Sequence, residues 1–391
     1  MMYEKEVKEK VTAILPQVVT WRRHFHEYPE LSGKEVKTSA YIQDVFKNLG
    51  IPYETGFFQN AVLGIIKGSH PGKTVALRAD MDALPVTELT GLPFASKNEG
   101  VMHACGHDGH MSILLGAAAV LNEMKDQIHG TVKIVFQPAE EEAAIGGRHI
   151  AASGKLDDVS EIYGLHVWPE LPTGQVGLKP GALMAASDRF YVHIKGKSTH
   201  AAQPHNGTDA LVAAAHFIID VQSLISREMN PMDNVVCTIG LMNAGTRYNV
   251  GVEDAYLEGT CRTYRPELRN KMEARLGEIL KGLDVMFHTH SELNYVRGHS
   301  ATINTPEKID FLKKVGKAYL GEEHITEPEF PSMCAEDFSS YLEKFPGAFF
   351  WLGTGDGNTP ALHNASFAIN ESILPLGITL EAAAALEALS R

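Results

Sequence analysis

The sequence predicts an α/β protein in which a smaller domain is inserted into a larger one. The chain has 391 residues, more than a single hydrophobic core usually accommodates, so two domains are expected. In the first half, short apolar strands alternate with helical stretches, which is the pattern of a mixed, mostly parallel sheet flanked by helices. After Leu183 the order changes to strand–helix–strand–strand–helix–strand, the ferredoxin-like βαββαβ arrangement.

The elements of the larger domain follow from the spacing of apolar residues and from glycine and proline. A helix is expected over 4–28, with Pro16 interrupting it or starting it afresh, and a second helix runs from Ser32 or Gly33 to Gly50. The sequence then predicts strands over 74–80, 130–141, 160–170 and 347–355 and a helix over 110–126. Residues 303–320 and the chain beyond them return to α/β character.

The inserted domain is expected at 182–297, so that 1–181 and 298–391 form the larger domain. Residues 188–197 alternate like a half-exposed strand, and 209–228 read as a long amphipathic helix. The remaining elements are strands over 234–245 and 252–264, a helix over 266–283 with Pro266 in its first turn, and a strand over 284–296.

Charge and cysteine usage narrow the class of protein. The chain has 35 Lys and Arg against 48 Asp and Glu, a net charge of −13, which argues against nucleic acid or an anionic membrane as the main partner. The start, MMYEKEVKEK, lacks the apolar core of a signal peptide, and the apolar runs are shorter than the roughly 20 residues of a membrane span. Four widely spaced cysteines are no disulfide framework, so a reducing, cytoplasmic location is expected.

Potential ligand residues follow the ends of the predicted strands. They are Asp80 and Asp82, Glu140 and Glu141, His166, His363, and the segment MHACGHDGH at 102–110, which contains Cys105 and His107. Parallel strands place their carboxyl ends at one edge of a sheet, where α/β proteins build ligand sites. Cysteine, histidine and carboxylate side chains together suit zinc or a similar divalent ion, so a metal site is predicted at this edge.

Each residue taken alone has a simpler interpretation. The glutamates could be a solvated strand end, His166 a hydrogen-bonded core histidine, Cys105 an apolar filler and Asp108 a helix cap. The segment 102–110 resists this interpretation best, because its two glycines argue against a helical stripe there. With no CxxC pair and no HExxH helix, a catalytic centre is favoured over a structural zinc. Two adjacent glutamates suggest one metal ligand and one free general base.

The motifs together resemble those of a known family. They are RRHFHEYPELSGKE, LRADMDALPV, MHACGHDGH, FQPAEE, GLHVWPELPTGQV, GKSTHAAQPH, CAEDFSSY and LHNASF, and they run from residue 22 to 367. The chain resembles the aminoacylase and carboxypeptidase group of dinuclear metallohydrolases. Within it, the chain is similar to the N-acyl-L-amino-acid amidohydrolases, which include hippurate hydrolases, auxin-amino-acid conjugate hydrolases and N-acetyldiaminopimelate deacetylases.

The resemblance implies roles for single residues. The two divalent metal ions, zinc or manganese with cobalt or nickel as alternatives, would be bound by Cys105, His107, Glu141, His166 and His363, with Cys105 bridging. Glu140 would be the general base, and Asp82 would orient a ligand. His103 and His110 receive no ligand role and are expected at the surface or at a helix cap.

The same resemblance implies hydrolysis of the amide bond in N-acetyl or aromatic N-acyl amino acids. The inserted domain would serve as lid and dimerisation domain of a homodimer. His200 would stabilise the oxyanion in the partner subunit's site, Asn249 would contact the substrate, and Arg262 could bind a substrate carboxylate. The family often has glycine soon after its two glutamates, where this chain has Glu142 and Ala143, and its usual NVIP reads NVGV here. Both departures bear on substrate preference.

Three alternatives remain open. A dipeptidase or carboxypeptidase would use the same metal centre. A cysteine hydrolase, with Cys105 as nucleophile and His107 as base, would leave both glutamates, His166 and His363 without a task. A metal-binding protein without activity would leave Glu140 unexplained.

Overall fold

The computed structural model describes residues 3–142 and 145–390, and the chain divides into two compact units. Unit one comprises Met1–Leu183, Ile303–Pro331 and Asp337–Arg391, and unit two comprises Met184–Thr302 and Ser332–Glu336. Each unit has its own hydrophobic core. The sequence expectation placed 332–336 in the larger domain, whereas the structure groups this short return of the chain with unit two.

An eight-stranded sheet forms the centre of unit one, in the order β1-β2-β4-β3-β5-β14-β6-β13. Its strands are β1 (Tyr53–Glu54), β2 (Val62–Lys67), β3 (His70–Asp80), β4 (His129–Gln137), β5 (Val159–Pro172), β6 (Val176–Gly177), β13 (Ile325–Thr326) and β14 (Gly347–Gly355). The four central strands β4, β3, β5 and β14 are parallel, and β2 joins β4 antiparallel. The predicted mixed, mostly parallel sheet is therefore confirmed.

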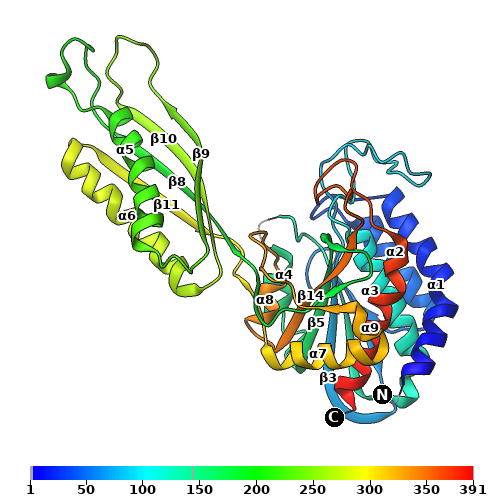
Figure 1. The fold of residues 1–391 in the computed structure, drawn as a ribbon. Helices are drawn as coiled ribbons and strands as arrows, with labels where there is room; N and C mark the ends of the chain where they lie inside the picture. The colour runs from blue at the N-terminus through cyan, green and yellow to red at the C-terminus, as the bar shows by residue number, and fades with distance from the viewer. Residues whose placement is uncertain (1–2, 143–144, 391) are drawn as a thin grey trace. The chain divides into compact units, whose positions relative to one another are not determined.

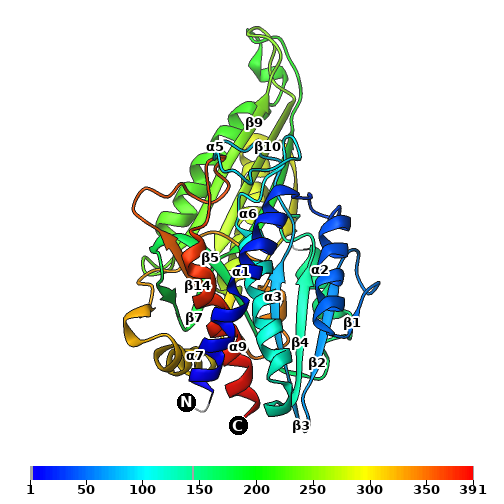
Figure 2. The ribbon, with the colours of Figure 1, turned by 90° about the vertical axis from the view of Figure 1, so that its right-hand side faces the viewer.

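Helices flank this sheet (Figure 1). They are α1 (Glu4–Glu27), α2 (Val36–Leu49), α3 (His107–Glu123), α4 (Ile145–Ala152), α7 (Pro306–Tyr319), α8 (Ser339–Leu342) and α9 (Leu374–Leu389). Helices α1, α3 and α9 pack on one another, and α3 and α9 contact β3, β4 and β5. The short strands β7 (Gly181–Met184) and β12 (Thr302–Asn304) pair where the chain passes between the units. Figure 2 shows α1, α3 and α9 side by side.

One expected helix interruption and one expected helix start in unit one were wrong for local reasons. Helix α1 runs through Pro16 without a break, and the proline ring lies on its exposed face. Helix α2 begins at Val36 rather than near Ser32, because the hydroxyl of Ser32 donates to Asp82 instead of capping the helix. The helix ends at Gly50 in the left-handed conformation, as the sequence predicted.

Unit two has the βαββαβ order. It consists of β8 (Ala186–Lys195), α5 (Ala210–Ser223), β9 (Val235–Ala244), β10 (Asp254–Thr263), α6 (Pro266–Phe287) and β11 (His290–Arg297). The sheet is antiparallel, in the order β11-β8-β10-β9, so β9 and β11 are its edge strands. Residues 284–287, expected in a strand, continue α6, which ends at His288 in the left-handed conformation.

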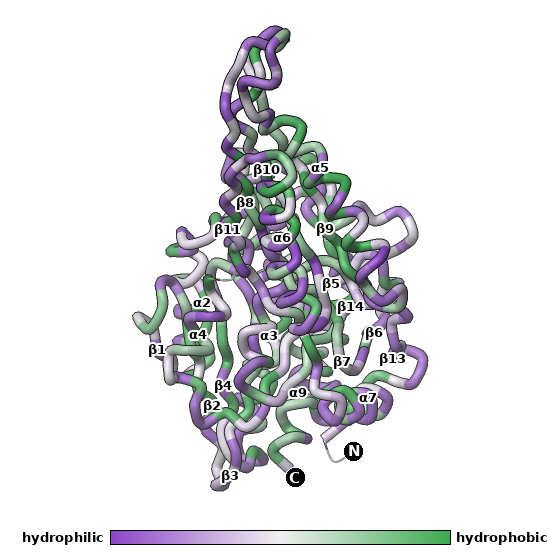
Figure 3. The backbone as a smooth tube through the Cα atoms, turned by 90° about the vertical axis from the view of Figure 1, so that its left-hand side faces the viewer, coloured by the Kyte–Doolittle hydropathy of each residue, from purple (hydrophilic) through white to green (hydrophobic). Residues whose placement is uncertain are grey.

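Two helical stretches of the described chain are long and apolar enough to cross a membrane by length and composition alone, Ala210–Glu228 and Glu371–Leu389. The second is α9 with its preceding turn, and it packs in the core of unit one. The first contains α5, whose inner face is buried by Ala213, Phe217 and Val221. Figure 3 shows hydrophobic residues along both helices.

Candidate metal centre

Polar side chains from several segments of unit one gather at the carboxyl edge of its sheet. The segments are the end of β3 with Asp80 and Asp82, the start of α3 with Cys105 and His107, the turn after β4 with Glu140 and Glu141, β5 with His166, and the loop after β14 with His363. The core of the cluster is buried, with Asp80 and His107 at 0% exposure and His166 at 3%. The side chain of His363 is 54% exposed, so the cluster opens to solvent at His363.

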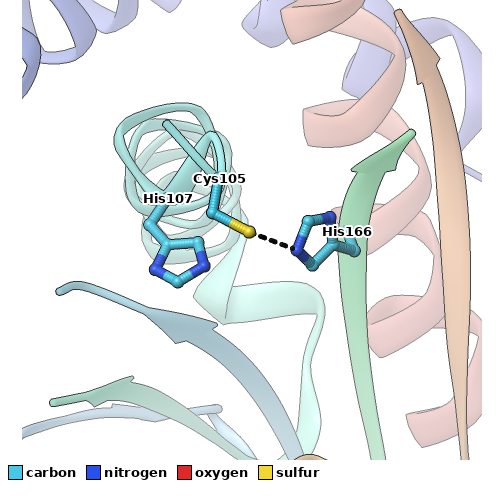
Figure 4. A group of neighbouring side chains, drawn as sticks. All are labelled: Cys105, His107 and His166. Carbon is cyan, nitrogen blue, oxygen red and sulfur yellow. Dashed lines mark hydrogen bonds between the residues drawn. The ribbon is translucent and has the colours of Figure 1, made fainter. Parts of the chain in front are cut away.

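The ligand atoms of these residues form overlapping groups of three, each with all atoms within 4.8 Å of one another. One group is Cys105, His107 and His166, and Figure 4 shows the thiol of Cys105 turned toward His166 with His107 beside it. A second joins Cys105 with Glu141 and His363, and a third joins His107 with Glu140 and Glu141. Thiolate, imidazole and carboxylate donors at this spacing fit a centre for borderline divalent ions.

The buried imidazole rings of His107 and His166 both direct Nε2 into the cluster. Nδ1 of His107 lies 2.9 Å from the carbonyl oxygen of Asp82, and Nδ1 of His166 lies 2.7 Å from that of Val167. Because a carbonyl only accepts, each Nδ1 carries a proton and Nε2 is the atom that can bind a metal. Nε2 of His107 is buried without a hydrogen-bond partner among the described residues, and Nε2 of His166 lies 3.3 Å from Sγ of Cys105. A metal ion would satisfy this orphaned nitrogen.

Asp82 connects three parts of the cluster. Its Oδ2 accepts from the hydroxyl of Ser32 at 2.6 Å and from the backbone N–H of Glu141 at 2.9 Å. Its Oδ1 lies 3.3 Å from Nδ1 of His107. The carboxylate therefore holds the turn that carries Glu141 against the ring of His107.

The backbone adopts left-handed conformations at two residues beside the cluster. Ala139, directly before Glu140, has φ +56°, and His363 has φ +66°. Such a conformation costs a non-glycine residue on the order of 1–3 kcal/mol, and residues of this kind concentrate at functional sites. Both are held in place: the N–H of Ala139 donates to Glu35 at 2.9 Å, and that of His363 donates to the carbonyl of Ala104 at 2.8 Å. His363 Nε2 then lies 3.3 Å from Oε1 of Glu141.

The electrostatics of the cluster favour a cation. Burial, followed by the charges of Glu141 and Glu140, raises the pKa of the Cys105 thiol well above its usual value. Burial alone would lower the pKa of His107, but Asp80 and Asp82 outweigh it and raise this pKa to about 10. A divalent ion would supply the missing positive charge and allow the thiolate to form. The raised pKa argues against Cys105 as a nucleophile, because reactive cysteines have lowered pKa values.

The expectation that His103 and His110 lie at the surface or at a helix cap was wrong. Both are 1% exposed, because the segment 102–110 folds into the interior of unit one. Asp108 does not cap α3; the helix starts at His107 after Gly106. Asp108 is instead buried, and its Oδ2 lies 2.9 Å from Nε of Arg22 and 2.8 Å from Nδ1 of His26.

A buried charged network beside the cluster was missed. Arg78, at 0% exposure, donates to Asp80, Gln137 and Asp337 at 2.8, 2.8 and 2.6 Å. The backbone N–H of Asp337 donates to Oε1 of Glu140 at 3.4 Å. An arginine within the apolar strand sequence TVALRAD was the available signal, because a buried guanidinium must be paired.

The other three predicted residues lie in unit two. His200 is exposed, and its Nδ1 accepts from the N–H of Ala202 at 3.1 Å. Asn249 lies in the β9–β10 connection, which borders a hollow of about 480 Å³ together with segment 197–211. Arg262 is on β10 and donates to the carbonyl of Cys261 at 3.2 Å. Ala143, noted as a departure in the sequence, lies outside the described residues.

Comparison with known proteins gives consistent matches over most of the chain. Residues 76–387 match the sequence profile of peptidase family M20/M25/M40. An N-acetyl-L-cysteine deacetylase of Bacillus subtilis is 40% identical over 358 residues, 92% of this chain and 85% of that protein. A thermostable carboxypeptidase of Saccharolobus solfataricus is 35% identical, with 98% of each chain covered.

A solved structure supports the fold and the chemistry of the site. The crystal structure of the Bacillus subtilis YXEP protein, described as a dinuclear metal binding peptidase from the M20 family, matches with a TM-score of 0.86 and 35% identity. The match covers 97% of this chain and 99% of that one.

Proposed function

Since the chain belongs to peptidase family M20/M25/M40 and is a hydrolase acting on amide bonds, we propose that it releases the acyl group from N-acyl amino acids. The family resemblance drawn from the motifs is confirmed. The observation that carries the proposal is Glu140, a carboxylate at 7% exposure next to a metal-binding arrangement of thiol, imidazole and carboxylate groups. A purely metal-storing site would not require it. The similarity to an N-acetyl-L-cysteine deacetylase supports an acetyl or other acyl amino acid as the substrate class.

We propose that two divalent ions are held by five residues, Cys105, His107, Glu141, His166 and His363, with Cys105 between them. The overlap of the donor groups at Cys105 supports its bridging role, because it shares one group with His107 and His166 and another with Glu141 and His363. When bound, the ions supply Lewis acidity to the scissile carbonyl and the attacking water. Zinc or manganese suits this donor set, with cobalt or nickel as alternatives.

Glu140 would take the proton of the attacking water and return it to the leaving amine. Its Oε1 accepts from the N–H of Asp337, and a ligand atom of its carboxylate lies within 4.8 Å of those of His107 and Glu141. Asp82 would orient His107 through the contacts of its carboxylate and carbonyl.

The roles of unit two are part of the proposal. We propose a homodimer in which unit two is the dimerisation and lid domain, His200 stabilises the oxyanion in the partner subunit's site, and Asn249 and Arg262 contact the substrate. The exposed position of His200 and the hollow beside Asn249 support this assignment. All four cysteines are free thiols, which supports a reducing, cytoplasmic location.

A carboxypeptidase or dipeptidase is the second candidate, favoured by the similarity to a thermostable carboxypeptidase. Both candidates hydrolyse an amide next to an amino acid, so the chemistry of the site does not separate them. Turnover of N-acetyl amino acids and hippurate, compared with dipeptides by the metal-loaded protein, would do so. Exclusive turnover of dipeptides would contradict the first candidate.

Substitution Glu140→Gln tests the mechanism. We expect the variant to keep its metal content while activity falls about 10²–10⁴-fold, the range that general acid–base groups contribute. Glu142→Gln is the matched control, because Glu142 is exposed two residues further along and should retain activity. Chelation should abolish activity reversibly. Normal activity of Glu140→Gln, or activity that survives chelation, would contradict the proposal.

A further inference from the structure

His110 is the one histidine of segment 102–110 with both ring nitrogens hydrogen-bonded within the described structure. We infer that His110 is a positioning residue, which ties the middle of β5 at Val167, and with it His166, to the buried Arg78–Asp80 pair. The inference rests on the proposed metal centre, since His166 is one of its ligands, and it assigns a task to a residue that the centre itself does not use.

The hydrogen bonds of His110 fix its tautomer. The backbone N–H of Val167 donates to Nε2 at 2.9 Å, so Nε2 is an acceptor and carries no proton. Nδ1 therefore holds the ring proton and donates it to Oδ1 of Asp80 at 2.6 Å. Although His110, Asp80 and His107 form a group at metal-ligand spacing, His110 has no lone pair left for an ion. It is excluded as a ligand.

The hydrogen bond between Val167 and His110 lies just beyond the last paired residues of β3 and β5. β3 and β5 pair in parallel as far as Arg78 and Gly164, and the register continues no further along β5. On the β3 side, the ring of His110 thus takes the place of a strand partner for Val167. The carbonyl of the same residue accepts from Nδ1 of His166, which directs Nε2 of His166 to Cys105. The main chain of Val167 therefore lies between the two rings.

The other nitrogen of His110 is anchored by buried charge. Asp80 is fully buried and accepts from Nη1 of Arg78 at 2.8 Å, and Arg78 is held in turn by Asp337. A buried ion pair of this kind is rigid, because each partner would be costly to leave uncompensated. The ring centroid of His110 lies 4.6 Å from that of His166 and 5.3 Å from that of His107. A shift of the His110 ring would therefore displace both neighbouring rings.

Two amide substitutions separate the two bonds of His110. In His110→Gln, the amide oxygen reaches the place of Nε2 and can accept from Val167, whereas in His110→Asn the amide reaches only the place of Nδ1 and can donate to Asp80. If positioning of β5 is the task, His110→Gln should keep more of the affinity for Zn²⁺ or Mn²⁺ than the other two variants, although it loses the bond to Asp80. His110→Asn and His110→Phe should lose tenfold or more, as changes behind a metal ligand do. Isothermal titration of metal into the chelated protein measures this.

A control of the same kind exists in unit two. Asp188 is a buried carboxylate at 1% exposure that accepts from Arg269 at 2.9 Å, so Asp188→Asn weakens a similar pair away from the metal ligands. It should lower the melting temperature and leave metal affinity unchanged, whereas Asp80→Asn should lower both. Equal losses of metal affinity in Asp188→Asn and Asp80→Asn would overturn the inference, because a general loss of stability would then explain the result.

Hydrogen exchange gives a readout that needs neither metal nor substrate. In the metal-free protein, the amide proton of Val167 should be protected in the parent and in His110→Gln, and should exchange at least tenfold faster in His110→Asn. The same exchange rate in all three proteins would overturn the inference even if hydrolysis occurs as proposed. A protein that shows the expected exchange and metal affinities but no turnover of N-acyl amino acids would contradict the proposed function alone.

Discussion

His26 and Asp108 show how burial changes what a single residue does. The imidazole of His26 lies between two carboxylates, with Nδ1 at 2.8 Å from Asp108 and Nε2 at 3.1 Å from Glu88. Burial alone would lower the pKa of His26, but Asp108 and Glu88 outweigh it and raise this pKa to about 9. The folded protein therefore keeps His26 protonated at pH values at which the unfolded chain would already have lost this proton.

The pH dependence of stability follows from this shift. Because the folded pKa of about 9 exceeds the unfolded value near 6.5, His26 stabilises the fold fully below pH 6.5 and loses this effect between pH 6.5 and 9. The contribution is about 3 kcal/mol at most, by the linkage of pKa to free energy. We expect His26→Gln to lower the melting temperature strongly at pH 6 and little at pH 10. Thermal melts of both proteins over this range test it.

His24 supplies the control of opposite sign. Burial lowers its pKa, so its neutral form is favoured in the fold and protonation at low pH opposes folding. The difference in melting temperature between His24→Gln and the parent should therefore shrink as the pH falls. A deficit of His26→Gln that is the same at pH 6 and pH 10 would contradict the assigned shift.

At the scale of elements, α3 depends on two glycines whose purpose the sequence left open. Gly106 has φ +88° and precedes the first turn, and a Cβ there would lie 2.4 Å from Cγ2 of Val167. Gly109, a residue that disfavours a helix, lies inside α3, where a Cβ would lie 2.5 Å from Cδ1 of Ile369. Both glycines let the helix start, with its cysteine and histidine, approach β5 and the C-terminal loop closely.

Gly106→Ala should therefore disrupt the metal centre as well as the helix. Gly50→Ala is the matched control: Gly50 also has positive φ, at +67°, but no atom lies within 4 Å of the added Cβ. The control should cost only the backbone strain of about 1–2 kcal/mol. Gly106→Ala should lose more than this in urea unfolding and also lose metal in elemental analysis. Equal destabilisation with full metal content in both variants would contradict this role of Gly106.

The mostly parallel sheet of unit one and the gathering of polar side chains at one of its edges were predictable, because they follow from the alternation of strands and helices and from the residues that end each strand. The bounds of helices were less so. Residues 284–287 were expected in a strand because the segment is apolar, but they complete the last turn of α6. In α3, Gly109 is needed because Ile369 packs closely against it. Ile369 is far away in the sequence, so no local sequence pattern could predict this contact.

At the scale of the whole molecule, contacts between distant segments limited the prediction. Arg78 and Asp337 are 259 residues apart, and only the folded sheet brings them together. The division into units also depends on such contacts, since 332–336 joins unit two although the chain on both sides belongs to unit one. The five residues proposed as metal ligands could nevertheless be singled out from the sequence, because each lies in or after a strand or at the start of a helix.

Unit two also leaves apolar surface unpaired. Val212 and Ile219 of α5, at 42% and 62% exposure, lie on one exposed stripe with Ala215 between them. The edge strand β9 exposes Val236 and Leu241 and offers unpaired backbone groups. An edge strand and an apolar stripe can be covered together by the same elements of a second copy about a twofold axis, which supports the proposed homodimer.

Ile219→Asp tests this dimer, because a charge on the stripe would be buried without a partner in the interface. We expect the parent to sediment as a dimer and the variant to shift to monomer at micromolar concentration. The monomer should keep its metal ions, since the ligands lie in unit one, but lose activity, since His200 would no longer reach a partner's site. Val285→Asp is the control, because Val285 is 78% exposed on α6 and should leave the dimer intact. A monomeric and fully active parent would contradict both the dimer and the role of His200, and a dimeric Ile219→Asp would move the interface away from α5.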